Sequence, residues 1–150
     1  MSVSLTHIAL HVQDLEACLD FYQRYAGLKL IRDRRPQGSD GKRIVWLAES
    51  GKEQDFIIVI LPGGPARNQQ DNDFSHLGFA LQSKQDVDDI AAKAQSENIL
   101  AWPCKQESYP VGYYCGIKDP DGNFVEFSYG QPLGPGAEKH ASAEFDINSH

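Results

Sequence analysis

Apolar and polar residues alternate near the start of the chain. Over residues 4–12, Ile8, Leu10 and Val12 fall on one side of an extended segment, and His7 and His11 fall on the other. A period of two is typical of a strand with one buried face. The pattern therefore predicts that a strand begins the chain, with its histidines on the less apolar face.

A helical pattern follows this strand over residues 15–26. Asp14 can cap the first turn by accepting from its free amides, and Gly27 can end the helix in the left-handed conformation. The apolar residues recur at helical spacing and predict a buried stripe of Leu15, Cys18, Leu19 and Tyr22.

Three further apolar stretches, separated by segments rich in glycine and polar residues, predict strands at 28–32, 43–48 and 56–61. Residues 4–61 therefore form a βαβββ module. The polar, turn-forming segment 62–75 is expected to be a linker.

The same order of elements recurs in the second half of the chain. We expect a strand at 76–82, a helix that starts after Ser83, and strands near 99–105, 111–118 and 123–129. The apolar stripe of this helix has the spacing of the first and comprises Val87, Ile90, Ala91 and Ala94. The repeat predicts an α+β fold of two βαβββ modules, 4–61 and 76–130, whose sheets curve as half-barrels around a cavity; residues 131–150 are expected to form a loose tail.

The segment Asp119-Pro120-Asp121-Gly122 predicts a tight hairpin turn. Counting outward from a four-residue turn pairs Lys118 with Asn123 and Cys115 with Glu126. This register places four side chains on one face of the sheet, namely Tyr113, Cys115, Glu126 and Ser128.

Composition excludes several classes of function. The formal net charge of −7, from 14 basic and 21 acidic residues, opposes binding to nucleic acid phosphates. No stretch of 18 apolar residues predicts a membrane span. The three cysteines lack the paired spacing of a zinc cluster and suit a reducing compartment, so we expect a cytoplasmic protein. A homodimer is the expected oligomer, because two-fold dimers are the commonest assemblies.

His7 and His76 begin equivalent strands, 69 residues apart, and Glu126 lies on the last strand of the second module. Two imidazoles and a carboxylate suit Zn²⁺, Ni²⁺, Fe²⁺, Mn²⁺ or Co²⁺, and they leave coordination positions open for water and substrate. The alternative interpretation is that both histidines are core residues and that Glu126 pairs with Lys or Arg. The matched positions of the repeat favour a site for one divalent metal.

Three segments, HIALHVQDLEACLDFYQRYAGLKLI, HLGFAL and DPDGNFVEFSY, resemble the vicinal oxygen chelate superfamily, which includes glyoxalase I, fosfomycin and bleomycin resistance proteins and extradiol dioxygenases. The resemblance extends over about residues 4–130. It implies paired βαβββ modules and a metal that binds a small substrate through neighbouring oxygen atoms. By motif, His7, His76 and Glu126 match three ligand positions of the family.

At the fourth ligand position this chain departs from the family. Aligning the two modules places Val59 opposite Glu126, where glyoxalase I-like enzymes carry a glutamate and the epimerases a glutamine. Val59 can neither bind a metal nor act as a base, so it is expected to be a substrate contact. His11, about 6.6 Å along the strand from His7, Tyr113 and Cys115 are the other expected substrate contacts.

The resemblance therefore implies a metal-dependent enzyme, with Glu126 and Tyr113 as the expected catalytic residues and a glyoxalase-like lyase or isomerase as the favoured activity. An iron-dependent dioxygenase could use the same three ligands. The remaining alternative is a metal-free protein that binds a drug-like small molecule in the cavity.

Overall fold

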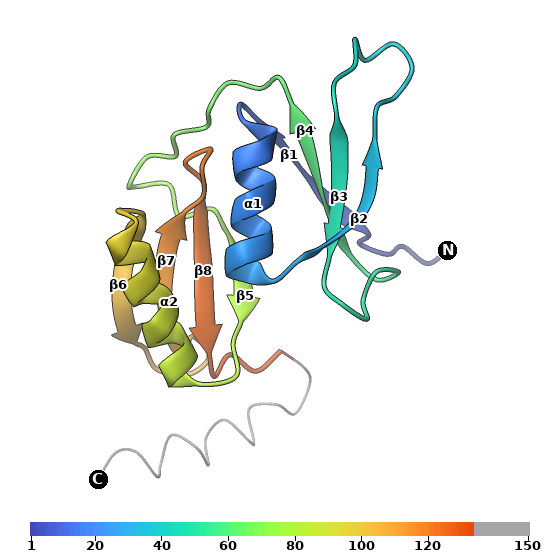
Figure 1. Ribbon diagram of the computed structural model, residues 1–150. Helices are drawn as coiled ribbons and strands as arrows, with labels where there is room; N and C mark the ends of the chain where they lie inside the picture. The colour runs from blue at the N-terminus through green and yellow to red at the C-terminus, as the bar shows by residue number, and fades with distance from the viewer. Residues whose placement is uncertain (134–150) are drawn as a thin grey trace, which may run out of the picture. The chain divides into compact units, whose positions relative to one another are not determined.

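The computed structural model describes residues 1–133, so residues 134–150 of the tail expected over 131–150 lie outside the described residues. Helices and strands follow one another in the order β-α-β-β-β, twice (Figure 1). The elements are β1 (His7–Val12), α1 (Leu15–Ala26), β2 (Lys29–Arg34), β3 (Ile44–Ala48), β4 (Ile57–Pro62), β5 (His76–Ala80), α2 (Lys84–Ser96), β6 (Leu100–Gln106), β7 (Tyr113–Lys118) and β8 (Phe124–Tyr129). The α+β fold of two βαβββ modules is confirmed.

Each half of the chain forms its own four-stranded mixed sheet. The strand orders are β1-β4-β3-β2 and β5-β8-β7-β6, with the first pair of each sheet parallel and the others antiparallel. In both sheets the strand that precedes the helix therefore pairs with the last strand of its module. Pro103 lies in β6, an edge strand, where its missing amide donor leaves the sheet intact.

Helix α1 begins and ends where the sequence predicted, and α2 begins where it predicted. The side chain of Asp14 accepts from the amide of Ala17, and Gly27 ends α1 with φ of 63°. Ser83 caps α2 by accepting from the amide of Asp86. The predicted stripe of α1 is buried, and Phe21 and Tyr25 are buried with it. These apolar faces anchor each helix on one face of its sheet and leave the other face free of helices.

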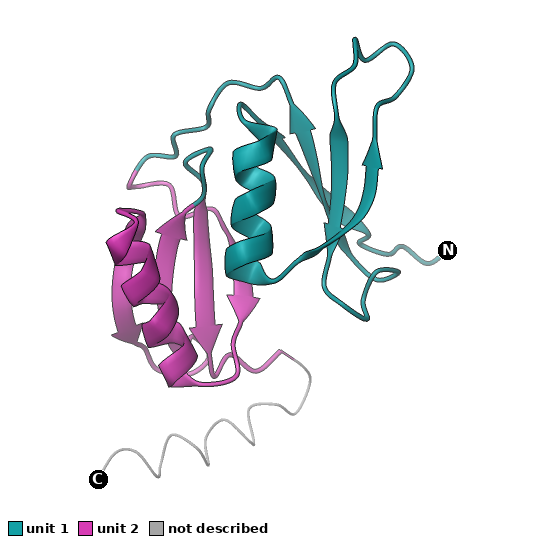
Figure 2. Ribbon diagram, viewed as in Figure 1, with its two compact units in different colours: residues 1–70, 119–123 teal, residues 71–118, 124–150 magenta. Residues whose placement is uncertain are grey.

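The chain divides into two compact units (Figure 2). Unit 1 contains residues 1–70 and the turn 119–123, and unit 2 contains residues 71–118 and those from 124 onward. The turn belongs to unit 1 through its contacts: Asp121 accepts from the amides of Gln13 and Arg67, and Asp119 accepts from the Tyr22 hydroxyl. In the described part of the chain, neither helix has the length and apolar character needed to cross a membrane.

Candidate metal and substrate site

His76 opens strand β5 of unit 2 with its imidazole oriented by the backbone. Nδ1 lies 2.7 Å from the carbonyl oxygen of Phe74. Because a carbonyl can only accept, Nδ1 carries the proton of this hydrogen bond, and Nε2 is the nitrogen that remains for a cation. Metal-binding histidines are commonly held in this way by a carbonyl behind the ring.

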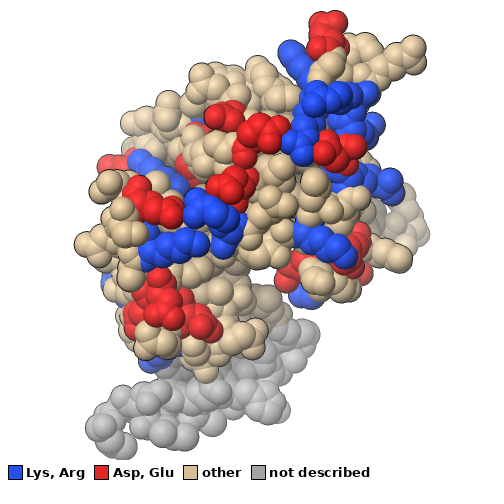
Figure 3. Space-filling model, in the orientation of Figure 1, with Lys and Arg blue, Asp and Glu red and all other residues tan. Residues whose placement is uncertain are grey.

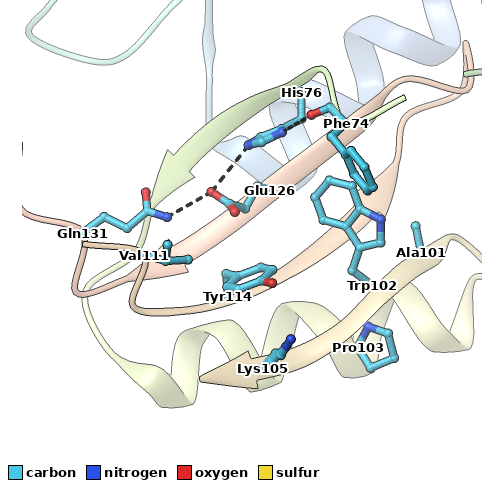
Figure 4. Close-up of a pocket in the computed structure, with 10 residues that line it drawn as sticks. All are labelled: Phe74, His76, Ala101, Trp102, Pro103, Lys105, Val111, Tyr114, Glu126 and Gln131. Carbon is cyan, nitrogen blue, oxygen red and sulfur yellow. Dashed lines mark hydrogen bonds and ion pairs between the residues drawn. The ribbon is translucent and has the colours of Figure 1, made fainter. Parts of the chain in front are cut away.

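Glu126 projects from the middle of β8 toward the same imidazole (Figure 4). Its Oε2 atom lies 3.9 Å from His76 Nε2, and its side chain is only 10% exposed. Its strand neighbours on both sides, Gly78 and Gly116, have no side chains, so the carboxylate has room in front of the sheet.

No Lys or Arg pairs with Glu126 among the residues that the structure describes. Its contacts there are His76 and the amide of Gln131, which donates to Oε2 at 3.2 Å. A carboxylate that is largely removed from water needs a compensating partner, and a cation could supply it. Two metal bonds of about 2.0–2.2 Å can bridge atoms up to about 4 Å apart, so the spacing of His76 and Glu126 fits one shared ion.

Both side chains belong to the wall of a cavity of about 670 Å³ in unit 2 (Figure 4). Trp102 of β6 stands edge-on to His76, with the ring centroids 5.6 Å apart. The wall is mostly apolar, and Lys105 is the cation on it. The lining residues are Phe74, His76, Ala101, Trp102, Pro103, Lys105, Val111, Tyr114, Glu126 and Gln131.

The predicted register of β7 and β8 is wrong by one residue. Glu126 pairs with Gly116, and Cys115 pairs with Phe127. Five residues, 119–123, separate the paired residues Lys118 and Phe124, one more than the four assumed. The amide of Asp119 donates to the carbonyl of Asn123, and Gly122 takes φ of 82°. Three residues, 120–122, lie between the bonded Asp119 and Asn123, as in a hairpin that ends on a left-handed glycine. The one additional residue between the strands reverses which side chains of β7 face the cavity.

The sequence predicted that Tyr113 and Cys115 share the sheet face of Glu126. This prediction is wrong, because both side chains lie on the opposite face. The Tyr113 hydroxyl donates to Asp88 of α2, and this hydrogen bond is the main cause that raises the pKa of Tyr113. The Cys115 thiol lies 3.9 Å from the carbonyl of Val87, and burial raises its pKa to about 12. Both residues pack toward helix α2, and Tyr114 occupies the place on the cavity wall that was expected for Tyr113.

His7, His11 and Val59 lie in unit 1 on the sheet face that carries no helix. His7 is exposed, and its Nδ1 lies 2.9 Å from the Thr6 hydroxyl. Val59 is flanked by Ala9 and Trp46, as Glu126 is flanked by Gly78 and Gly116. The predicted equivalence of Val59 and Glu126 is therefore confirmed.

The predicted ligands are thus divided between the units: unit 2 brings His76 and Glu126 together, and His7 lies in unit 1. Within residues 1–133, no three His, Cys, Asp or Glu side chains form a ligand cluster. Sequence reasoning missed Phe74, Tyr114 and Gln131 as wall residues. With the correct register, the pairing of Tyr114 with Ser128 would have indicated the tyrosine.

Comparison with protein families gives a match over most of the chain. Residues 4–127 match the model of the glyoxalase/bleomycin resistance protein/dioxygenase superfamily. An uncharacterized protein of Pseudomonas aeruginosa is 57% identical over 138 residues, which cover 92% of this chain and 96% of that protein. A lactoylglutathione lyase of Neisseria meningitidis is 28% identical, with 82% of this chain and 88% of the enzyme covered.

Solved structures share the fold at low sequence identity. The fosfomycin resistance protein FosX of Listeria monocytogenes superposes with a TM-score of 0.68 at 20% identity, covering 87% of this chain and 96% of FosX. Glyoxalase I of Leishmania major gives a TM-score of 0.61 at 20% identity, with 97% and 96% covered. One FosX structure is a complex with Mn(II) and a dihydroxypropylphosphonic acid.

Proposed function

Because the chain belongs to the glyoxalase/bleomycin resistance protein/dioxygenase superfamily, we propose that it is a divalent-metal-dependent enzyme acting on a small substrate held through oxygen atoms. The observation that carries the proposal is the pair of His76 Nε2 and Glu126 Oε2, 3.9 Å apart on a cavity wall. His7 is the proposed third ligand, supplied by unit 1 of the same chain or of a second copy in a homodimer.

We propose a lyase or isomerase of the glyoxalase type as the activity. A bound divalent cation would act as a Lewis acid that polarises the oxygen atoms of the substrate. The chain's own groups would orient the substrate and exclude water: Trp102 and Tyr114 are the aromatic walls, and the Gln131 amide holds the carboxylate of Glu126 in place. The lactoylglutathione lyase relative supports this choice over an oxygenase.

Metal binding by the purified 150-residue chain tests the proposal. After treatment with a chelator, the protein is titrated with Mn²⁺, Ni²⁺, Zn²⁺, Co²⁺ and, without oxygen, Fe²⁺, by calorimetry and elemental analysis. We expect one ion per site. His76→Gln and Glu126→Gln should weaken binding at least 100-fold, and Gln131→Ala about tenfold, as loss of a group that orients a ligand usually does.

Two variants control for general effects of these substitutions. Glu107→Gln removes a half-exposed carboxylate of unit 2 that pairs with Lys105 at 2.7 Å. His11→Gln removes a histidine on the same strand face as His7. Both should keep metal affinity, whereas His7→Gln should lower it. The proposal fails if no ion binds stoichiometrically or if His76→Gln and Glu126→Gln bind as the unchanged protein does.

The apolar cavity favours a second candidate function, binding of a hydrophobic small molecule without a metal. Six of its wall residues are aromatic, aliphatic or proline: Phe74, Ala101, Trp102, Pro103, Val111 and Tyr114. A predominantly apolar wall with a few polar groups is typical of sites for such ligands. Ligand binding that survives the chelator and the Glu126→Gln substitution would support this function over the enzyme.

A further inference from the structure

Arg32 and Arg34 lie on the helix-free face of the first sheet. One row of paired residues crosses all four strands. It consists of Arg32, Trp46, Val59 and Ala9, each paired with the next. Paired residues of neighbouring strands share a face, and so do residues two apart on one strand. The row therefore places both arginines on the sheet face that also carries His7.

Both guanidinium groups lie over the same indole ring. The Cζ atom of Arg32 is 5.0 Å from the centroid of the Trp46 ring, and that of Arg34 is 5.7 Å away. Stacking on an aromatic face orients a guanidinium and leaves its N–H edge available. A forked N–H edge matches the geometry of a carboxylate or phosphate.

Arg32 and Arg34 contact an aromatic ring, whereas two other arginines of the same unit form ion pairs with carboxylates. Arg24 pairs with Asp20, and Arg43 pairs with Asp33 and Glu16. Where α1 faces the viewer, basic and acidic side chains lie next to each other (Figure 3). On the helix-free face, the four described strands contribute Lys29, Arg32 and Arg34 and no Asp or Glu.

Two positive charges held on one ring repel each other, and an anion between their N–H edges would turn this repulsion into attraction. The chain's net charge of −7 makes a polyanion an unfavourable partner. A small molecule with one anionic group needs only these two arginines, and the indole adds an apolar surface for the rest of it.

We propose that Arg32 and Arg34, stacked on Trp46, bind the oxyanionic group, carboxylate or phosphate, of a small organic molecule. His7 lies on the same face, on the opposite edge strand β1. We identify this molecule with the substrate of the enzyme proposed above, and that identification rests on the proposed function. The substrate class is then a small organic acid or phosphate ester that is recognised by its anionic end at Arg32 and Arg34.

Tryptophan fluorescence of the 150-residue chain can measure this binding. In a Trp102→Phe background, Trp46 is the remaining tryptophan and reports directly on the two arginines. Chelator-treated protein is titrated with inorganic phosphate and, separately, with succinate, at constant ionic strength set by chloride. We expect a saturable change in fluorescence, and Arg32→Gln or Arg34→Gln should weaken binding of the anion at least tenfold.

Arg24→Gln is the matched control, because it removes an arginine of the same unit that is paired with Asp20. Its affinity for the anions should be unchanged. Arg32→Lys keeps the charge but loses the fork, so its affinity should lie between those of Arg32→Gln and the unchanged protein. A stronger response to phosphate than to succinate would indicate a phosphate ester, and the reverse would indicate a carboxylic acid.

The proposal is overturned if the fluorescence change does not saturate, if chloride alone reproduces it, or if Arg24→Gln weakens binding as much as Arg32→Gln does. It is also overturned if the anions bind only after metal is restored, since the metal would then be their binding site. If the anions bind but no metal does, the arginine site is supported and the metal-dependent function is refuted. Failure of the arginine site and failure of the proposed function therefore give different results.

Discussion

The indole of Trp102 lies directly against Gly116, so closely that a Cβ atom on residue 116 would stand 2.1 Å from Cε3 of the ring. Gly116 is also the strand neighbour of Glu126. The absence of a side chain at residue 116 therefore affects two residues of the cavity wall. It allows the indole of Trp102 to pack against the strand, and it leaves space beside the carboxylate of Glu126.

Gly116→Ala is expected to displace the indole of Trp102 from β7. The added methyl group overlaps the ring, and overpacking of this kind typically costs about 1–3 kcal/mol. The free energy of unfolding in urea should fall by this amount, and the tryptophan emission should shift as the indole moves. Gly78→Ala is the control, because a Cβ there would be 3.6 Å from Oε2 of Glu126, an ordinary contact.

A double-mutant cycle tests the physical reason for this effect. If the overlap with Trp102 is the cause, Trp102→Ala should remove most of the penalty of Gly116→Ala, and the two changes should be strongly non-additive. Additive effects would show that residue 116 needs glycine for another reason.

Tyr22→Phe is expected to destabilise unit 1 in a pH-dependent way. The buried Tyr22 hydroxyl donates to Oδ2 of Asp119 at 2.6 Å, and a hydrogen bond to a charged group is worth about 1.5–3 kcal/mol. Burial, followed by the charge of Asp119, raises the pKa of Tyr22 well above its ordinary value. The unfolded chain therefore ionises this tyrosine first, at pH about 10.

The sign of the pH effect follows from this order of ionisation. The stability contributed by Tyr22 is fully present below pH 10 and is lost as the pH rises toward the folded-state pKa. The free energy of unfolding in urea is measured for the unchanged protein and for Tyr22→Phe. The two values should differ strongly at pH 8 and less at pH 11. An equal difference at both pH values would contradict the raised pKa.

The fold could be predicted from the sequence because its signals are local and occur twice. Asp14 and Gly27 mark the ends of α1 by backbone chemistry that needs no tertiary information. The equivalence of Val59 and Glu126 followed from aligning the ends of two similar strands, and the strand pairing confirms it. Periodicity and capping therefore determined the modules and the positions within them.

The site could be predicted only in part, because the face that a strand presents depends on the length of a turn. Gly122 in the left-handed conformation adds one residue to the hairpin loop and exchanges Tyr113 for Tyr114 on the cavity wall. The sequence shows the glycine but leaves open which turn it completes. Phe74 and Gln131 lie beyond the ends of β5 and β8, where strand periodicity carries no information.

Thiol reactivity provides a direct test of which way β7 faces. Cys18 and Cys115 are fully buried, and burial is the main cause that raises the pKa of each thiol to about 12. At pH 8 about one in ten thousand of such thiols is ionised, and the thiolate is the reactive form. Cys104 is partly exposed, and its pKa is raised mainly by burial as well.

In the folded protein at pH 8, a chromogenic disulfide reagent should therefore modify Cys104 first, and denaturant should expose three thiols. Cys104→Ser should abolish the early phase, whereas Cys115→Ser should leave it intact. Loss of the early phase in Cys115→Ser would mean that this thiol opens toward the cavity beside Glu126, as the four-residue turn predicted, and would refute the observed pairing of Cys115 with Phe127.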